Sequence, residues 1–236
     1  MRYVYQAYTD KGGRTNNEDK FALGKSKNGY LFLVADGLGG YGKGEIASGL
    51  VCEEIFRQFN IKAEFDLNQA ILHANYLLIE KQKELGIKMK TTLVAAWVRK
   101  KTTVLVHVGD SRIYAFGKSG IIFQTEDHSA AQLSLRVQES DTDVRRMEER
   151  NILTRALGMS EEVELEQQEL ENFKYDRLLL CSDGFWEYVF ENEMIDSRRK
   201  WQSPRAWLNK MQYILRSKIH CDNDNNTAIA VMKRRI

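Results

Sequence analysis

Apolar residues gather in six short runs along the chain, and polar or charged segments separate these runs. The runs are rich in β-branched, aromatic and aliphatic side chains, which is typical of strands buried on one or both faces. A further strand is expected near the N-terminus, over residues 3–9. The six predicted strands span residues 30–35, 92–98, 102–108, 112–116, 177–182 and 227–232.

Three other segments have apolar residues at helical spacing. The first runs from about residue 45 to residue 59. The second begins after Asp66, which can cap it, and Gln69 completes a capping-box spacing. The third begins at Ser203, an N-cap that is followed by proline at the first helical position. Because strands come in groups and helices in pairs, the order predicts an α+β fold with layered sheets rather than a regular βαβ alternation.

The composition is that of an ordinary globular protein, with 43% hydrophobic and 29% charged residues among 236. A net charge of +2 gives no electrostatic reason to expect a nucleic-acid or membrane partner. No apolar run approaches the roughly 18 residues that cross a membrane, and the first residues do not resemble a secretion signal. The three cysteines are scattered, which favours a reducing compartment, and we expect the cytoplasm.

We expect one domain over residues 1–236, because no linker, repeat or low-complexity stretch interrupts the chain. The segment at about 127–151 is polar, carries both signs of charge and lacks a clean apolar stripe. We interpret it as a flap-like surface excursion, partly helical and mobile, and call it the flap. An ordinary exposed helix with solvated charges is the alternative.

Aspartates recur where predicted strands end. Asp36, Asp110 and Asp183 each follow an apolar strand closely, and Asp224 lies just before the last strand. A single aspartate in such a place is usually a turn former. Four aspartates in this position are harder to explain as turn formers alone, because the ends of packed strands converge in space. Carboxylates that are brought together repel one another unless cations lie between them. Oxygen ligands without a cluster of histidines or cysteines select Mg²⁺ or Mn²⁺.

Two such ions about 3.5–4 Å apart can lower the pKa of a bridging water and direct it at phosphorus. A guanidinium nearby could hold phosphate oxygens in a two-pronged contact, and Arg14 is the candidate. Glu18 and Asp19 lie in the same N-terminal segment, "RTNNED".

The glycine-rich loop "VADGLGGYGKGE" also fits two nucleotide-binding patterns in part. A phosphate loop needs Ser or Thr after its lysine, but Gly44 follows Lys43. A dinucleotide site needs an acid at the end of a second strand about 20 residues on, and the acids there fall in the predicted helix. Both nucleotide hypotheses therefore fail, and the glycines more plausibly allow a tight backbone around Asp36, with the Gly37 carbonyl able to reach a metal.

The motifs together resemble the protein phosphatase 2C family of metal-dependent Ser/Thr phosphatases. The resemblance rests on "RTNNED", "VADGLGGYGKGEIAS", "TTLVAA", "VHVGDSRIYAF", "DHS", "ILTRALG", "LLLCSDGFWEYV" and "DNNTAIAV", in the order of the family. These matches extend from Arg14 to Val231. The implied fold is two stacked antiparallel β-sheets flanked by helices on both outer faces.

The resemblance also implies a site and a reaction. Water or hydroxide bridging two Mn²⁺ or Mg²⁺ ions would attack phosphoserine or phosphothreonine directly, in protein substrates of a cognate Ser/Thr kinase. Asp36 would bridge the metals, the Gly37 carbonyl and the Asp183 and Asp224 carboxylates would complete the ligands, and Arg14 would hold the phosphate. Asp110 with Asp183 would hold a third, weaker ion, while Glu18, through water, and Asp19 would support the cluster.

One departure from the family concerns the group that protonates the leaving alkoxide. Some members have a histidine two residues after the first aspartate, and here this residue is Leu38. His128 could reach the site only if the flap folds over it, and no side-chain acid is assigned. The enzyme, expected as a monomer, is the favoured hypothesis; a catalytically weak phosphatase-fold sensor or scaffold that binds a partner through the flap is the alternative.

Overall fold

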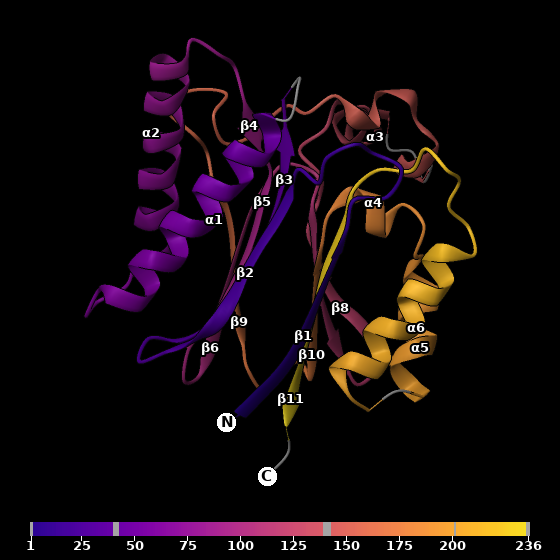
Figure 1. The fold of residues 1–236 in the computed structure, drawn as a ribbon. Coiled ribbons are helices and arrows are strands. Elements are labelled where there is room, and N and C mark those ends of the chain that lie inside the picture. Colours follow the sequence, from indigo (N-terminus) through magenta and orange to yellow (C-terminus); the bar gives the residue numbers. More distant parts are fainter. Residues whose placement is uncertain (1, 40–42, 139–142, 201, 235–236) are drawn as a thin grey trace.

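The computed structural model describes residues 2–39, 43–138, 143–200 and 202–234. Two antiparallel sheets are stacked face to face, and helices cover both outer faces (Figure 1). The first sheet contains, in spatial order, β1 (Arg2–Asp10), β11 (Asn226–Arg234), β10 (Arg177–Cys181), β7 (Arg112–Gly117) and β8 (Gly120–Gln124). The second contains β2 (Asp19–Ser26), β3 (Gly29–Leu38), β5 (Leu93–Val98), β6 (Thr102–Val108) and β9 (Glu166–Glu171), with β4 (Lys90–Thr91) paired to β3.

Helices form the two outer layers. On the left of Figure 1, α1 (Lys43–Ile61) and α2 (Leu67–Leu85) cover the sheet that contains β3. On the right, α5 (Glu191–Lys200) and α6 (Pro204–Arg216) cover the sheet that contains β11. The short helix α4 (Asp183–Trp186) directly follows β10. This α-β-β-α arrangement is the predicted fold class.

The alternation of side chains along the central strands explains these layers. In β3, Leu31 and Leu33 pack in the core beneath α1 and α2, whereas Phe32 and Val34 pack between the two sheets. Successive side chains of a strand point to opposite faces, so a strand covered on both sides is apolar throughout. This is why the central strands are evident in the sequence as continuous apolar runs.

The three predicted helices are present, with caps where the sequence places them. Asp66 accepts a hydrogen bond from the Gln69 N–H at 2.9 Å and so caps α2. Ser203 accepts one from the Ala206 N–H at 3.2 Å, ahead of Pro204 in the first turn of α6. These side chains satisfy N–H groups that have no partner within the helix.

Two strands that the sequence does not predict, β2 and β9, are the edge strands of the second sheet. Five of the six residues of β9 are exposed, and its sequence "EQQELE" has only one apolar residue. An edge strand with one solvated face has little apolar pattern to detect. The short β8 and the helix α5 also escaped prediction.

The described part of the flap contains α3 (Ala130–Gln138) and the 3₁₀ turns η2 (Val144–Arg146) and η3 (Glu148–Asn151). The prediction of a partly helical segment is therefore correct, and residues 139–142 lie outside the described residues. An isolated β-bridge between Ser129 and Leu153 joins the two ends of the flap. Whether the flap is mobile stays a prediction.

Candidate metal centre

Asp36 lies at the end of β3 and faces Asp19 of β2 in the antiparallel register. Its backbone N–H donates to the Thr92 hydroxyl at 3.0 Å. Its carbonyl accepts from the Thr91 hydroxyl at 2.8 Å and from the Thr92 N–H at 2.9 Å. The two threonines thus fix the main chain of Asp36 from the side of β4 and β5, a role that the sequence analysis did not assign.

Gly37 occupies a position where a side chain has no space. A Cβ atom built there would lie 2.1 Å from the Gly44 carbonyl oxygen and 2.8 Å from that of Glu18. The missing side chain allows the end of β3, the first turn of α1 and the Glu18 segment to meet. This agrees with the prediction of a tight backbone after Asp36, whereas Gly40 to Gly42 lie outside the described residues.

Asn225 joins the N-terminal segment to the C-terminal acid. Its side-chain N–H groups donate to the carbonyls of Lys11 and Asn16, and its Oδ1 accepts from the Glu18 N–H at 2.8 Å. The neighbouring Asp224 is therefore held close to Glu18, although more than 200 residues separate them in the sequence. In the sequence, Asn225 is evident only as part of the motif "DNNTAIAV".

These elements enclose an open cleft of about 610 Å³. Six of the eight predicted site residues line it: Arg14, Glu18, Asp36, Gly37, Asp183 and Asp224. The other two, Asp19 and Asp110, are buried, with exposed fractions of 2% and 6%. Both still interact electrostatically with Asp36.

Burial and the nearby charges of other acids raise the pKa values of several aspartates at this site. Burial, and then the charges of Asp19, Asp183 and Asp110, hold the pKa of Asp36 well above its usual value. Burial and then the Asp110 charge do the same to the pKa of Asp183. Burial, followed by the Asp127 charge, raises the pKa of Asp110 to about 7. Carboxylates whose charges raise one another's pKa values resist ionising together, so the site favours a compensating positive charge.

The donor set fits hard divalent cations. Among the described residues that line the cleft there is no histidine or cysteine, and Arg14 supplies the one cationic side chain. One oxygen of Asp19 accepts from the Ser182 hydroxyl at 2.7 Å, while Oδ1 is buried without a hydrogen-bond partner in the described part of the chain. Carboxylate and carbonyl oxygens are the ligands that Mg²⁺ and Mn²⁺ prefer.

Sequence comparison decides the family. Residues 11–222 match the sequence profile of the Protein phosphatase 2C family, which is most of the chain. The chain belongs to the protein phosphatase 2C family. A curated relative, Serine/threonine phosphatase stp from Listeria welshimeri, is 34% identical, and the match covers 94% of this chain and 93% of the relative.

Solved structures of phosphatases have the same fold as this protein phosphatase 2C member. Serine/threonine phosphatase Stp1 from Staphylococcus aureus matches with a TM-score of 0.88 and 29% identity, over 100% of this chain and 96% of the other. The catalytic domain of the phosphatase PstP, in complex with two manganese ions, matches with a TM-score of 0.81 and 28% identity, over 98% and 97% of the two chains. The predicted family and fold class are confirmed.

Arg14 does not point freely into the cleft of this family member. Its Nε and Nη2 atoms donate to the two carboxylate oxygens of Asp224, at 3.0 and 2.8 Å. The side chain is 57% exposed, so it is accessible to a substrate. The pairing shows that the guanidinium can hold an oxyanion with two parallel hydrogen bonds, which is the geometry that a phosphate requires.

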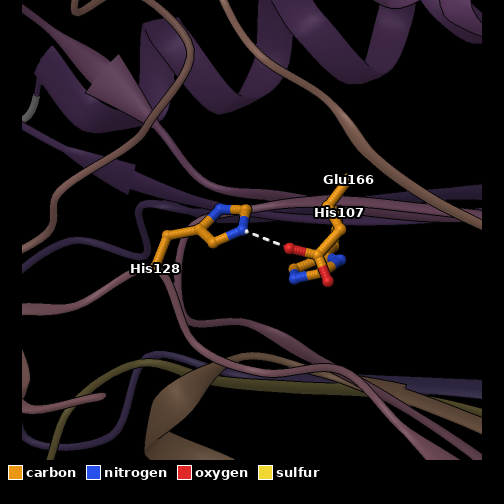
Figure 2. Close-up of side chains that lie close together, drawn as sticks. All are labelled: His107, His128 and Glu166. Carbon is orange, nitrogen blue, oxygen red and sulfur yellow. Dashed lines mark hydrogen bonds and ion pairs between the residues drawn. The ribbon is translucent and has the colours of Figure 1, made fainter. Parts of the chain in front are cut away.

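A second group of metal-binding residue types lies outside the cleft. His107, His128 and Glu166 offer ligand atoms within 4.8 Å of one another, and Figure 2 shows the contact between His128 and Glu166. The Gly109 N–H donates to Nδ1 of His128 at 3.2 Å, so this nitrogen carries a lone pair. Nε2 must then carry the proton, and it donates to Glu166 at 3.1 Å. A protonated Nε2 is not a metal ligand, and we interpret the group as a hydrogen-bonded anchor.

His128 is buried, with an exposed fraction of 7%, and His107 stacks on it with ring centroids 4.6 Å apart. Neither histidine lines the cleft. His128 therefore does not line the metal centre in this structure. Its backbone N–H and Nδ1 both bind Gly109, which precedes Asp110.

Proposed function

We propose that this chain hydrolyses phosphoserine and phosphothreonine in proteins, with the acidic cleft as its active site. Its family membership and its relatives support the class of metal-dependent protein-serine/threonine phosphatase. The observation that supports the site most strongly is the convergence of Asp36, Asp183 and Asp224 from three separate strand ends on one open cleft. Mn²⁺ or Mg²⁺ is the cofactor, as the family and the manganese-containing relative indicate.

In this proposal Asp36, the Gly37 carbonyl, Asp183 and Asp224 would hold the two catalytic ions. When bound, the ions supply the Lewis acidity that generates a hydroxide nucleophile from water near neutral pH. Asp110 is the proposed ligand of a third and weaker ion. It is buried, and its charge raises the pKa of Asp183. Two aspartates on different strands can hold one ion only if the ends of both strands are fixed in position. Hydrogen bonds from Thr91 and Thr92 to the main chain of Asp36 fix the end of β3.

Arg14 and Asp36 are the proposed catalytic residues. Arg14 would bind two oxygens of the substrate phosphate in place of the Asp224 carboxylate, which would then be free to hold an ion. Binding in this way orients the phosphorus toward the nucleophile, and the P–O bond to serine or threonine breaks. The alkoxide must receive a proton, and no histidine lines the described cleft, so we assign that step to solvent rather than to a side chain.

Glu18 and Asp19 are proposed to support the ligands from behind. Glu18 lines the cleft, so its carboxylate can accept hydrogen bonds from water that is bound there. Asp19 is held by the Ser182 hydroxyl and lies opposite Asp36 in the sheet. Groups of this kind orient metal ligands and raise their affinity.

The wider setting of the enzyme is also part of the proposal. We infer that residues 1–236 form one catalytic domain, since β1 and β11 pair along their whole length and so join the two ends of the chain. Its substrates are phosphorylated proteins, in particular those of a cognate Ser/Thr kinase, and its expected state is a monomer. The three cysteines are free thiols, which supports a reducing compartment such as the cytoplasm. No helix in the described part of the chain is long and apolar enough to span a membrane.

Hydrolysis of p-nitrophenyl phosphate and of a phosphothreonine peptide, measured with Mn²⁺ and again with excess chelator, tests the function. We expect activity with Mn²⁺ that the chelator abolishes and that added Mn²⁺ restores. Activity that persists in chelator would exclude the metal mechanism. No activity under either condition would favour the sensor or scaffold alternative.

A further inference from the structure

A second hollow lies beside the metal centre and has no role in the proposed chemistry. This side groove, of about 500 Å³, lies between the end of α2, the strand β4 and the loop after the flap. Its walls include Ile79, Lys88, Met89, Lys90, Gly158 and Met159. Two further residues, Leu38 and Gly39, line both the side groove and the catalytic cleft. A chain bound in one can therefore continue directly into the other.

Hydrogen bonds hold the walls of the side groove in place. The loop that carries Met159 is joined to β4 by reciprocal backbone hydrogen bonds between Thr91 and Leu157, at 3.0 and 2.9 Å. Gln82 of α2 donates to the Gly158 carbonyl at 2.9 Å. Gly158 has a left-handed φ of +85°, and a Cβ there would approach the Met89 carbonyl to 2.7 Å. The groove is thus preformed, which lowers the entropy cost of binding a peptide.

The side groove combines an apolar surface with positive charge. Met159 is 47% exposed, and Ile79 and Leu38 are partly exposed, so apolar side chains face solvent there. Lys88 is exposed and Lys90 partly exposed. The nearby Lys81 and Lys83 pair with Glu84 and Glu80.

The two groove lysines differ from these neighbours. Among residues 2–39, 43–138, 143–200 and 202–234, neither Lys88 nor Lys90 takes part in an ion pair, and no acidic residue lines the groove. Unpaired cations beside an exposed apolar surface are complementary to a ligand with a carboxylate next to an apolar side chain.

We propose that the side groove binds the substrate segment next to the phosphorylated residue and selects segments with an acidic and an apolar side chain. This inference rests on the proposed function, since the phosphate must occupy the cleft while the flanking residues occupy the groove. Lys88 and Lys90 attract the acidic side chain, and Met159 with Ile79 covers the apolar one. These side chains contact the flanking segment, so they determine specificity without taking part in the reaction.

The test compares phosphothreonine peptides that differ only in the flanking residues: acidic with leucine, neutral with leucine, acidic with serine, and basic with leucine. The variant K88E/K90E should lower kcat/KM for the first peptide by roughly 10-fold, because each exposed ion pair contributes about 1.4-fold to 5-fold and reversal adds repulsion. The same variant should raise kcat/KM for the basic peptide. Its hydrolysis of p-nitrophenyl phosphate, which occupies only the cleft, should not change.

Matched controls use the opposite end of the sandwich. Lys100 and Lys101 are exposed in the turn between β5 and β6, so K100E/K101E makes the same change of charge away from the groove. Met159→Ala should reduce the preference for leucine over serine, whereas Phe173→Ala, at a residue that is 72% exposed in the turn before β10, should not.

The outcomes separate the two proposals. Equal kcat/KM for all peptides in the wild-type enzyme, or the same response of K88E/K90E and K100E/K101E, would overturn the side-groove proposal while leaving the phosphatase intact. Absence of Mn²⁺-dependent hydrolysis of every substrate would instead reject the proposed function. If the charge effect is direct, it should also weaken as salt concentration rises.

Discussion

Arg112 and Asp127 form a buried ion pair next to the metal centre. The guanidinium of Arg112 donates from Nε and Nη2 to the two oxygens of Asp127, each at 2.8 Å. Both side chains are almost fully excluded from solvent, and the guanidinium also lies 3.5 Å from the centroid of the Trp186 ring. Trp186 donates in turn to the Asp110 carbonyl at 2.9 Å. The pair thus supports the segment that carries Asp110.

We expect Asp127→Asn to lower the free energy of unfolding by about 1.5–3 kcal/mol, because the buried Arg112 loses the carboxylate that accepts its two short hydrogen bonds. Only Glu191, whose Oε1 lies 3.5 Å from Nη1, then remains as a counter-charge. Urea denaturation measures this loss. The adjacent Glu126→Gln is the matched control, since Glu126 pairs with Arg136 on the surface. Exposed pairs contribute about 1 kcal/mol or less. Similar losses in the two variants would show that burial of the Arg112 pair does not matter.

The sequence identified the segments around this pair but not the pair itself. In the sequence, Arg112 is part of the motif "VHVGDSRIYAF" and Asp127 is part of the motif "DHS". Their contact depends on how β7 and the start of the flap meet in three dimensions, which periodicity along one strand does not specify. In contrast, Asp36 and Asp183 follow apolar runs of strands covered on both faces, and the end of each run marks the place of the aspartate in the sequence.

Asp36→Asn should lower kcat by more than about 100-fold, because even the loss of groups that only support metal ligands reduces activity by about 10-fold to 100-fold. The substitution keeps the size of the side chain and removes its charge, so the fold should persist. Mn²⁺ titration by calorimetry should show weaker binding in parallel. Retention of full activity at saturating Mn²⁺ would contradict the role assigned to Asp36.

Arg14→Ala should mainly raise KM for phosphoproteins, by roughly 10-fold to 100-fold, which is the effect of losing hydrogen bonds to a charged group. In metal-free protein the same variant also frees Asp224 from its two-pronged contact. Arg14→Lys keeps the charge but not the paired geometry, so it should restore only part of the affinity. Steady-state kinetics with a phosphopeptide measure these effects, and an unchanged KM in both variants would exclude Arg14 as the phosphate ligand.

Asp110→Ala should weaken the third ion while the two catalytic ions remain bound. Asp110 is buried behind the cleft and does not line it, whereas Asp36, Asp183 and Asp224 do. A Mn²⁺ titration should therefore lose its weakest phase and retain the tighter ones. If all Mn²⁺ binding phases weakened equally, Asp110 would contribute to every ion, which would contradict its assignment to the third ion alone.

The contribution of four aspartates at the metal centre to the stability of the metal-free protein should fall as pH rises from about 4 to about 7. Burial and neighbouring acids raise the pKa of Asp110 to about 7 and that of Asp19 to about 6, and the pKa values of Asp36 and Asp183 move in the same direction. Unfolded aspartate has a pKa of about 3.9. Between these limits the four aspartates bind more protons in the folded chain than in the unfolded chain, so their contribution to the free energy of unfolding decreases as pH increases.

Divalent cations should reverse this loss, since they bind the ionised carboxylates of the folded state. We therefore expect Mn²⁺ to raise the Tm by more at about pH 7.5 than at about pH 5.5, with chelator-treated protein as the reference at each pH. Asp110→Asn removes one of the groups with a raised pKa, so the Tm of its metal-free form should depend less on pH over the same interval. An equal Mn²⁺ effect at both pH values would mean that protons and cations do not compete for these carboxylates, and that the cations bind elsewhere.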